Sequence, residues 1–455
     1  MPPACNTAGV APCIPGDGNL ANIPYGNKIV LAKNPDVGPN PVNDMFGPRI
    51  GLAWRPAEKT VVRAGYGLVY ASMMGAIQTF QANVGAWPDA INTQLSFNPV
   101  GAPLTTIQDL QSLSASALPT ATPWSTQNWM YDPNIKPARS HQWNVGIQRE
   151  MAHNLMLSIA YVGSKTDRLN VTGLFNVSPT AGAGTAAEVD ARRPFPWAAA
   201  TFMGESIGSA HYNSLQISAE KRHSGGLAFL ISYTWSKAMD VGGSGFYGSE
   251  NGAGGSAAVQ NFYNIKEDWG VSSYDITHNL SASIMYELPA GKGKRFLNKG
   301  PLSYILGDWQ VNTITALRSG QPYNLDVLGD VANIGNSVGW WSYARPNLVG
   351  DPHVANPTSQ EYYNPAAFSI PVNSFGNFGK NVLRSAPVYN VDFSLFKMFP
   401  IRENVKLEFR AEAFNVFNIQ NLGVPGVDIG TPDAGVVTSV AVPPRQIQFG
   451  LKLRF

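Results

Sequence analysis

The sequence is poor in charged residues and contains no long apolar run. Asp, Glu, Lys and Arg make up 14% of its 455 residues, whereas about 25% is usual for a soluble globular protein. The 32 basic and 30 acidic residues nearly cancel, which argues against nucleic acid as the main partner. No apolar run reaches the roughly 18 residues that a membrane helix needs, so a helical membrane protein is excluded. A β-barrel stays possible, because its spans are only about 10 residues of alternating pattern.

The sequence also contains only two cysteines, and its first residues show no secretory signal. The two cysteines, Cys5 and Cys13, lie in an N-terminal segment rich in Gly, Pro and Asn. They could form a small disulfide loop or stay reduced, and both alternatives remain open. The first residues carry neither the basic region nor the apolar core of a signal peptide. An exported protein needs such a signal, so a membrane-barrel interpretation predicts that the chain is the C-terminal part of something longer.

We find no candidate catalytic, cofactor-binding or metal-binding site. No histidine stands at a metal-ligand spacing from another histidine or a cysteine. The six are His141, His153, His211, His223, His278 and His353. Gly65 and Gly67 lie inside an expected strand, where small residues leave room for a plug or loops, so we do not interpret them as a phosphate-binding loop. We predict that the protein is not an enzyme.

The last eleven residues, 445–455, alternate strictly between apolar and polar or small side chains. The apolar positions are Ile447, Phe449, Leu451, Leu453 and Phe455, and the positions between them are Gln446, Gln448, Gly450, Lys452 and Arg454. Period-two alternation predicts a β-strand with one apolar and one polar face. Within this strand Gln448, Gly450, Leu453 and Phe455 are spaced in a way that resembles the C-terminal signal recognised by the machinery that assembles outer-membrane barrels.

The same alternation recurs throughout the chain and predicts eleven strands. Short and long connections follow one another five times, which is typical of an up-and-down sheet. We expect an irregular segment over residues 1–45 and one β-barrel region over 46–455. The expected strands cover residues 46–55, 62–70, 140–151, 154–165, 212–223, 227–236, 276–288, 309–317, 389–395, 405–413 and 445–455.

Four successive charges on one face of a strand decide the class of sheet. They are Lys406, Glu408, Arg410 and Glu412. Each buried, unpaired ion costs several kcal/mol, so these side chains need water. About 10 residues at 3.3 Å, tilted near 45°, span the roughly 25 Å apolar band of an outer membrane. We therefore predict an all-β, antiparallel transmembrane β-barrel with lipid on one side and a wet lumen on the other. The four charges either line a substrate path or form a salt-bridged lumen wall.

Aromatic residues at the strand ends predict two girdles at the membrane surfaces. We expect an outer rim of Tyr70, Trp143, Tyr161, Trp235 and Phe417, and a periplasmic rim of Trp54, Tyr286, Trp309 and Phe455. Outer-membrane lipid is then the surrounding partner. Further aromatics occupy the long loops, where they either bind an external ligand or pack the loops together. These are Trp340, Trp341, Tyr343, Tyr362 and Tyr363.

Several phrases of the sequence together resemble one family. They read FGPRIGLAW, TVVRAGYGLVY, QWNVGIQRE, YNSLQISAEKR, SYTWSKAMD, FRAEAFNVFN and FGLKLRF, and they are similar to the C-terminal half of the Oar-like TonB-dependent receptors of bacterial outer membranes. The resemblance implies an upstream carboxypeptidase-regulatory-like domain, a plug and a segment that contacts TonB. Plugged transporter barrels have 22 strands, so the eleven expected here indicate half a barrel.

The leading functional hypothesis is therefore a fragment of an outer-membrane receptor that binds and takes up an external ligand. The alternative is an adhesion or surface-structural barrel that transports nothing. A secreted soluble β-sandwich or propeller that binds carbohydrate is a third hypothesis, which the charged alternation and the terminal Phe455 disfavour. The ligand itself cannot be read from the sequence.

Overall fold

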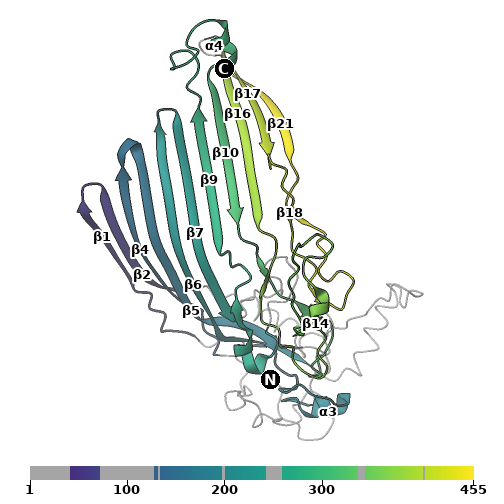
Figure 1. Cartoon of the computed structure of the whole chain (residues 1–455). Helices are drawn as coiled ribbons and strands as arrows, with labels where there is room; N and C mark the ends of the chain where they lie inside the picture. Colours follow the sequence, from purple (N-terminus) through teal and green to yellow (C-terminus); the bar gives the residue numbers. More distant parts are fainter. Residues whose placement is uncertain are drawn as a thin grey trace, which may run out of the picture.

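One large antiparallel sheet dominates the structure (Figure 1). The computed structural model describes residues 41–71, 128–131, 134–196, 200–241, 259–336, 344–402 and 405–455. Eleven strands pair in sequence order, each with the next. They are β1 (Arg49–Ala57), β2 (Thr60–Tyr70), β4 (Arg139–Met151), β5 (Leu155–Leu174), β6 (Thr201–Ser224), β7 (Leu227–Val241), β9 (His278–Glu287), β10 (Trp309–Arg318), β16 (Val388–Arg402), β17 (Val405–Phe414) and β21 (Gln446–Arg454). The predicted fold class and the eleven strands are confirmed, and the sheet is open, with β1 and β21 at its edges.

The connections divide between the two ends of the strands, as Figure 1 shows. At one end, here called the short-turn end, four of the five turns contain only two or three residues. Gly225 and Gly226 form the turn between β6 and β7 with φ of 62° and 80°, a conformation that glycine adopts at little cost. The fifth turn, residues 288–308, is much longer and contains helix α4 (Pro301–Leu306).

Short elements occupy the long connections at the other end. β3 (Asn128–Tyr131) pairs with β6 and β8 (Trp269–Val271) pairs with β7. None of the helices in the described part of the chain is long and apolar enough to cross a membrane. Helix η3 (Ala152–Asn154) instead forms the short turn between β4 and β5. The remaining elements of the long connections are α3 (Ala186–Ala191), η4 (Phe262–Asp268), η5 (Pro365–Ala367) and the small pairs β11 (Pro322–Tyr323) with β15 (Leu383–Arg384), β12 (Asp326–Val327) with β19 (Asp428–Ile429), β13 (Asn347–Leu348) with β14 (Phe368–Ser369), and β18 (Asn421–Leu422) with β20 (Val440–Val442).

The strand register gathers the apolar side chains on one face of the sheet, here called the apolar face. Directly paired residues point to the same side, so one row can be followed across nine strands. It runs through Trp54, Val62, Ile147, Ile159, Ile217, Tyr233, Leu280, Leu317 and Tyr389. Ile50 and Leu451, on the two edge strands, are 73% and 72% exposed. A face this apolar and this open fits lipid rather than water.

Three strands extend further toward the long connections than the alternation predicts. β5 continues to Leu174, β6 begins at Thr201 and β7 reaches Val241. The pairing of β5 with β6 shifts register between Asp167 and Val171, where the membrane-type alternation stops. Beyond that point Val171 and Leu174 are buried in a core formed with the long loops. Tertiary packing, rather than strand patterning, maintains this extension.

Candidate functional site

The four predicted lumen charges lie together on the polar face of β17, opposite the apolar face. Glu408 is central: its side chain is only 3% exposed, and it forms ion pairs with Arg410 and with Arg454 of the neighbouring β21. Gln448 donates a hydrogen bond of 2.6 Å to Glu412. Because two guanidinium groups share one carboxylate, this patch forms a cross-linked wall between the last two strands.

We expect Glu408→Gln to weaken this wall. Arg410 and Arg454 would lose the carboxylate that compensates them, and because both guanidinium groups are partly exposed the expected cost is about 1–2 kcal/mol. Thermal unfolding in detergent, followed by the gel mobility of the folded sheet, measures the loss. Glu412→Gln is the matched control, because Glu412 is less buried and accepts its hydrogen bond from the neutral side chain of Gln448. Equal melting of the two variants would contradict a special role for Glu408.

The residues of the predicted assembly signal lie at the exposed edge of the sheet. β21 is exposed along its whole length, and Phe455 follows its last residue with 98% of its surface exposed. Gln448 and Gly450 pair with Glu412 and Arg410 on the polar face, whereas Leu453 pairs with Leu407 on the apolar face. The four residues therefore sit on both faces of one accessible strand.

The predicted girdle aromatics fall on the apolar face at both ends. Toward the short-turn end lie Trp54, Tyr286 and Trp309, and toward the long loops lie Tyr70, Trp143, Tyr161 and Trp235. Phe417 lies beyond the end of β17 and is 69% exposed. Sequence reasoning missed two tyrosine–histidine pairs among the outer aromatics. They are Tyr66 with His141 and Tyr233 with His278, each joined by a 2.8 Å hydrogen bond to the Nδ1 atom.

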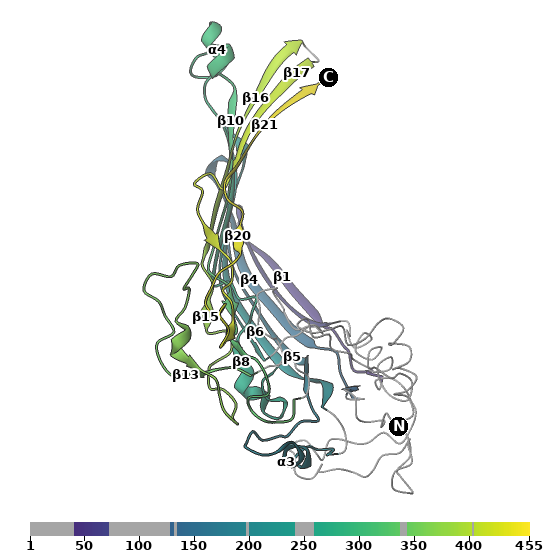
Figure 2. The ribbon, with the colours of Figure 1, turned by 90° about the vertical axis from the view of Figure 1, so that its right-hand side faces the viewer.

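The long connections form a packed body rather than separate loops, here called the external loop cluster. It comprises the described residues of the long connections and the outer ends of β5, β6 and β7. One core surrounds Phe175 and Phe262, and a second surrounds Leu325 and Phe368. Figure 2 shows this cluster below the sheet, at the end away from α4. Gly/Pro-rich composition alone had indicated only irregular loops.

Three ion pairs fasten the cluster to the sheet and to itself, with carboxylates that are at most 3% exposed. They join Asp240 to Lys380, Asp268 to Arg345 and Asp275 to Arg384. Burial raises the pKa of the Asp268 carboxyl, and Arg345 opposes that rise. The Arg345 guanidinium also donates to the carbonyl oxygens of Phe378 (2.8 Å) and Glu267 (3.2 Å). Arg345 therefore ties three separate segments together.

Of the five predicted loop aromatics, only Tyr362 and Tyr363 lie within the described residues. Tyr363 is 2% exposed within the second core, and its hydroxyl donates to the carbonyl oxygen of Gly426 at 2.8 Å. Burial raises the pKa of this phenol, which remains a hydrogen-bond donor. Tyr363 thus packs the cluster and offers no external surface, whereas Tyr362 is half-buried. Trp340, Trp341 and Tyr343, like Cys5 and Cys13, lie outside the described residues.

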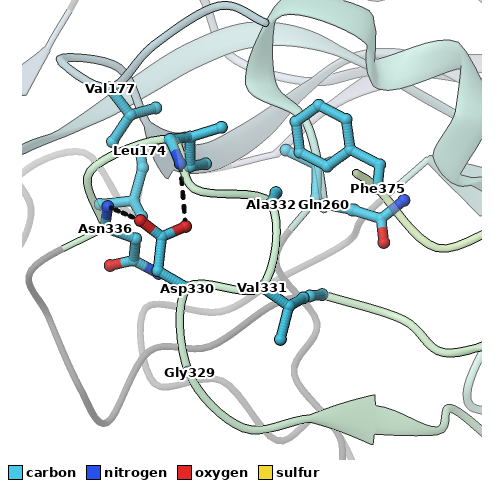
Figure 3. A pocket seen from close by; sticks show the side chains of 12 residues that line it. Leu174, Val177, Gln260, Gly329, Asp330, Val331, Ala332, Asn336 and Phe375 are labelled. Atoms are coloured by element: carbon cyan, nitrogen blue, oxygen red, sulfur yellow. Dashed lines mark hydrogen bonds between the residues drawn. The ribbon is translucent and has the colours of Figure 1, made fainter. Parts of the chain in front are cut away.

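A small cavity lies in the external loop cluster, between its two apolar cores (Figure 3). Its volume is about 30 Å³, enough for one or two waters but not for an organic ligand. Asp330 borders it and accepts backbone hydrogen bonds from Ile334, Gly335 and Asn336 at 3.0, 2.7 and 2.9 Å. Leu174, Val177 and Phe375 make the rest of the wall largely apolar. The Asp330 carboxylate organises its own loop.

No described residues form a recognisable catalytic or metal centre. Within the described ranges no three His, Cys, Asp or Glu side chains converge as metal ligands. Residues 204–208 do match Gly-x-Ser-x-Gly, which sequence reasoning passed over. However, Ser206 lies within β6 and its hydroxyl donates to the carbonyl oxygen of Lys136 at 2.7 Å, whereas a nucleophilic serine needs a sharp strand-to-helix turn. Residues 243–248 match Gly-x-Gly-x-x-Gly and lie outside the described residues.

Comparison with known proteins gives one family and several structures of low similarity. The family described as "Outer membrane beta barrel domain" matches residues 7–448. No curated protein matches the sequence. Among solved structures, the ferric-catecholate import receptor Fiu from Escherichia coli K12 is similar at 12% identity and a TM-score of 0.40, covering 90% of this chain and 34% of that one.

Two further structures give the same result. A mutant of the ferric enterobactin receptor PfeA from Pseudomonas aeruginosa, in complex with enterobactin, is 12% identical with a TM-score of 0.44, covering 90% of this chain and 40% of that one. The FrpB iron transporter from Neisseria meningitidis is 10% identical with a TM-score of 0.40, covering 89% and 38%. The chain therefore spans well under half the length of these three proteins.

Proposed function

Because the chain belongs to the outer membrane beta barrel domain family, we propose that it forms the C-terminal part of an Oar-like TonB-dependent receptor. The protein resides in the outer membrane of a Gram-negative bacterium. The complete receptor binds a ligand at the cell surface and takes it up, with energy delivered through TonB. In this proposal the barrel region begins near Phe46, and the barrel-assembly machinery inserts the receptor into the membrane. The receptor is not an enzyme.

The direction of the two edge strands carries this proposal. β1 and β21 both run toward the short-turn end, since an odd number of antiparallel strands begins and ends in the same direction. Closing the eleven strands on themselves would require one parallel pair among strands that otherwise pair antiparallel with their neighbours in sequence. An odd number of further strands between β21 and β1 restores antiparallel closure. Eleven more give the 22 strands of a plugged transporter and remove both open edges.

A second candidate function is adhesion without transport. The external loop cluster favours it, because two apolar cores and three buried ion pairs make a preformed body at the cell surface. Such a body can present a binding surface without any plug or energy coupling. The two candidates share the outer-membrane sheet and differ in what lies upstream.

One experiment on the protein isolated from its own outer membrane separates these candidates. Mass spectrometry gives the size of the chain and any upstream peptides, and a column carrying the periplasmic domain of TonB tests retention. We expect a protein about twice as long as 455 residues that TonB retains. A long protein that TonB does not retain favours adhesion. A free-standing 455-residue protein without retention overturns the transport proposal.

A further inference from the structure

The turn between β9 and β10 is unlike the other turns at the short-turn end. Residues 288–308 contain four basic residues and one acidic residue, Asp308; the bases are Lys292, Lys294, Arg295 and Lys299. The turn also has an internal frame. Gly291 donates from its N–H to the carbonyl oxygen of Phe296 at 2.9 Å, and Asp308 donates from its N–H to that of Ala290 at 2.8 Å. It is therefore an ordered structure and not a simple reversal of the chain.

Lys397 fixes helix α4 on the lipid side of the sheet. It pairs with Trp309 in the register between β16 and β10, which places it on the apolar face. Its ammonium donates to the carbonyl oxygens of Tyr304, Ile305 and Gly307 at 2.6, 2.9 and 2.7 Å. These three bonds use every N–H of the ammonium and satisfy carbonyls that a helix end leaves without partners.

Aromatic rings complete this lock. The Lys397 ammonium lies 5.3 Å from the ring centre of Trp309 and 4.9 Å from that of Phe399, distances at which a cation is attracted to a ring face. The Trp309 indole N–H donates to the carbonyl oxygen of Ile305 at 3.1 Å. Figure 2 shows α4 standing beside the end of β10, away from the splayed ends of β16, β17 and β21. The helix is thus held at the rim of the apolar face.

The side chains that α4 presents are apolar and open. Leu302, Tyr304, Ile305 and Leu306 are between 50% and 67% exposed, and Phe296 is 54% exposed. The short-turn end faces the periplasm in an outer-membrane barrel, so these side chains lie at the level of the periplasmic leaflet. Apolar residues next to basic ones at that level are typical of segments that lie in a membrane interface.

Three of the four basic residues supply charge that no ion pair among the described residues neutralises, and Lys294 is the exception. Lys294 lies 3.5 Å from Glu287 and 3.8 Å from Asp308. Within the described residues Lys292, Arg295 and Lys299 form no ion pair, and all three are exposed. We propose that the turn of residues 288–308 binds the anionic phospholipid headgroups of the periplasmic leaflet, with α4 inserted among the acyl chains beside them.

Native mass spectrometry of the purified protein tests this proposal. The protein is incubated with phosphatidylglycerol or with phosphatidylcholine of the same chain length, and bound lipids are counted. We expect a preference for phosphatidylglycerol that falls at least about tenfold in the variant Lys292→Gln/Arg295→Gln/Lys299→Gln. The matched control Lys59→Gln/Lys136→Gln/Lys266→Gln removes the same charge from exposed sites elsewhere and should keep the preference.

Two outcomes would overturn the proposal. One is equal binding of the two lipids by the unaltered protein, which would mean that α4 is covered without headgroup recognition. The other is an equal loss of preference in both triple variants, which would mean that net charge alone attracts the lipid.

A positioning variant, Lys397→Met, tests the role of the lock. It keeps all three exposed bases but leaves the end of α4 without its cation. We expect faster hydrogen exchange in residues 301–306 and a reduced phosphatidylglycerol preference, while exchange in β17 and β21 stays unchanged. Fast exchange in α4 with an undiminished lipid preference would show that the helix takes no part in binding.

Discussion

Replacing Arg345 with methionine should open the external loop cluster at neutral pH. The substitution leaves Asp268 with a carboxylate that is only 3% exposed and has lost its closest cation. Removing one partner of a buried pair costs about 3–5 kcal/mol. Since the Arg345 guanidinium also donates to the carbonyl oxygens of Glu267 and Phe378, we expect protease cleavage within residues 259–275 and 344–350 to accelerate strongly. The matched control is Lys266→Met, which removes an exposed cation from the same segment.

The defect of this variant should shrink as the pH falls. Burial already raises the pKa of Asp268, and Arg345 opposes that rise, so loss of Arg345 should raise the pKa further. A carboxyl whose pKa is higher in the folded state binds more protons there, so its contribution to stability grows as pH falls through the folded pKa and is complete below the unfolded pKa. Protection of the cluster in Arg345→Met should therefore recover under mildly acidic conditions. Adding Asp268→Asn should abolish that recovery, and a pH-independent defect in Arg345→Met alone would contradict the assignment.

The membrane part of the fold could be predicted from sequence because its environment imposes a simple code. Each spanning strand meets lipid on one side and water on the other, so its side chains alternate. Residues as distant as Trp54 and Tyr389 consequently fall in one row of the apolar face. This code does not predict the lengths of β5 and β6. Their outer ends are held because Val171 and Leu174 are buried in a core that the strands share with the long connections.

The contacts that organise the external loop cluster could not be predicted. Asp268 and Arg345 are separated by 77 residues, and nothing in the spacing of either residue indicates the other. Loop composition rich in Gly and Pro predicts turns, but it carries no period that reports which side chains are buried. Tyr363 illustrates the consequence: as a loop aromatic it is equally compatible with ligand binding and with packing, and only its 2% exposure decides between them.

Lys397 is a case in which the sequence did contain a signal. Phe393, Leu395 and Lys397 follow one another at every second position of β16, so their side chains lie on the same face of the strand. The alternation itself therefore places a cation among apolar side chains. A charged residue at such a position needs compensation or a route to the interface. The break in the pattern thus indicates a local partner, which the structure provides in the end of α4.

Deletion of Phe455 should reduce insertion into the outer membrane far more than it reduces the stability of inserted protein. Phe455 follows β21 and is 98% exposed, so the folded sheet loses almost no contact. If the assembly machinery recognises this side chain, the bound state buries it, and an aromatic side chain leaving water contributes about 1.5–3 kcal/mol. That corresponds to at least about tenfold weaker recognition.

For Phe449→Ala, in the same strand, we expect the opposite result: reduced stability with normal insertion. Phe449 lies outside the proposed signal, and its ring stacks on Phe409 at 6.4 Å between centres. Its loss should lower the melting temperature while insertion proceeds normally. The amount of heat-modifiable protein in the outer membrane measures insertion, and the melting temperature of the inserted fraction measures stability. If both variants affect insertion equally, the C-terminal strand is needed only for its apolar surface, and the pattern of Gln448, Gly450, Leu453 and Phe455 carries no separate signal.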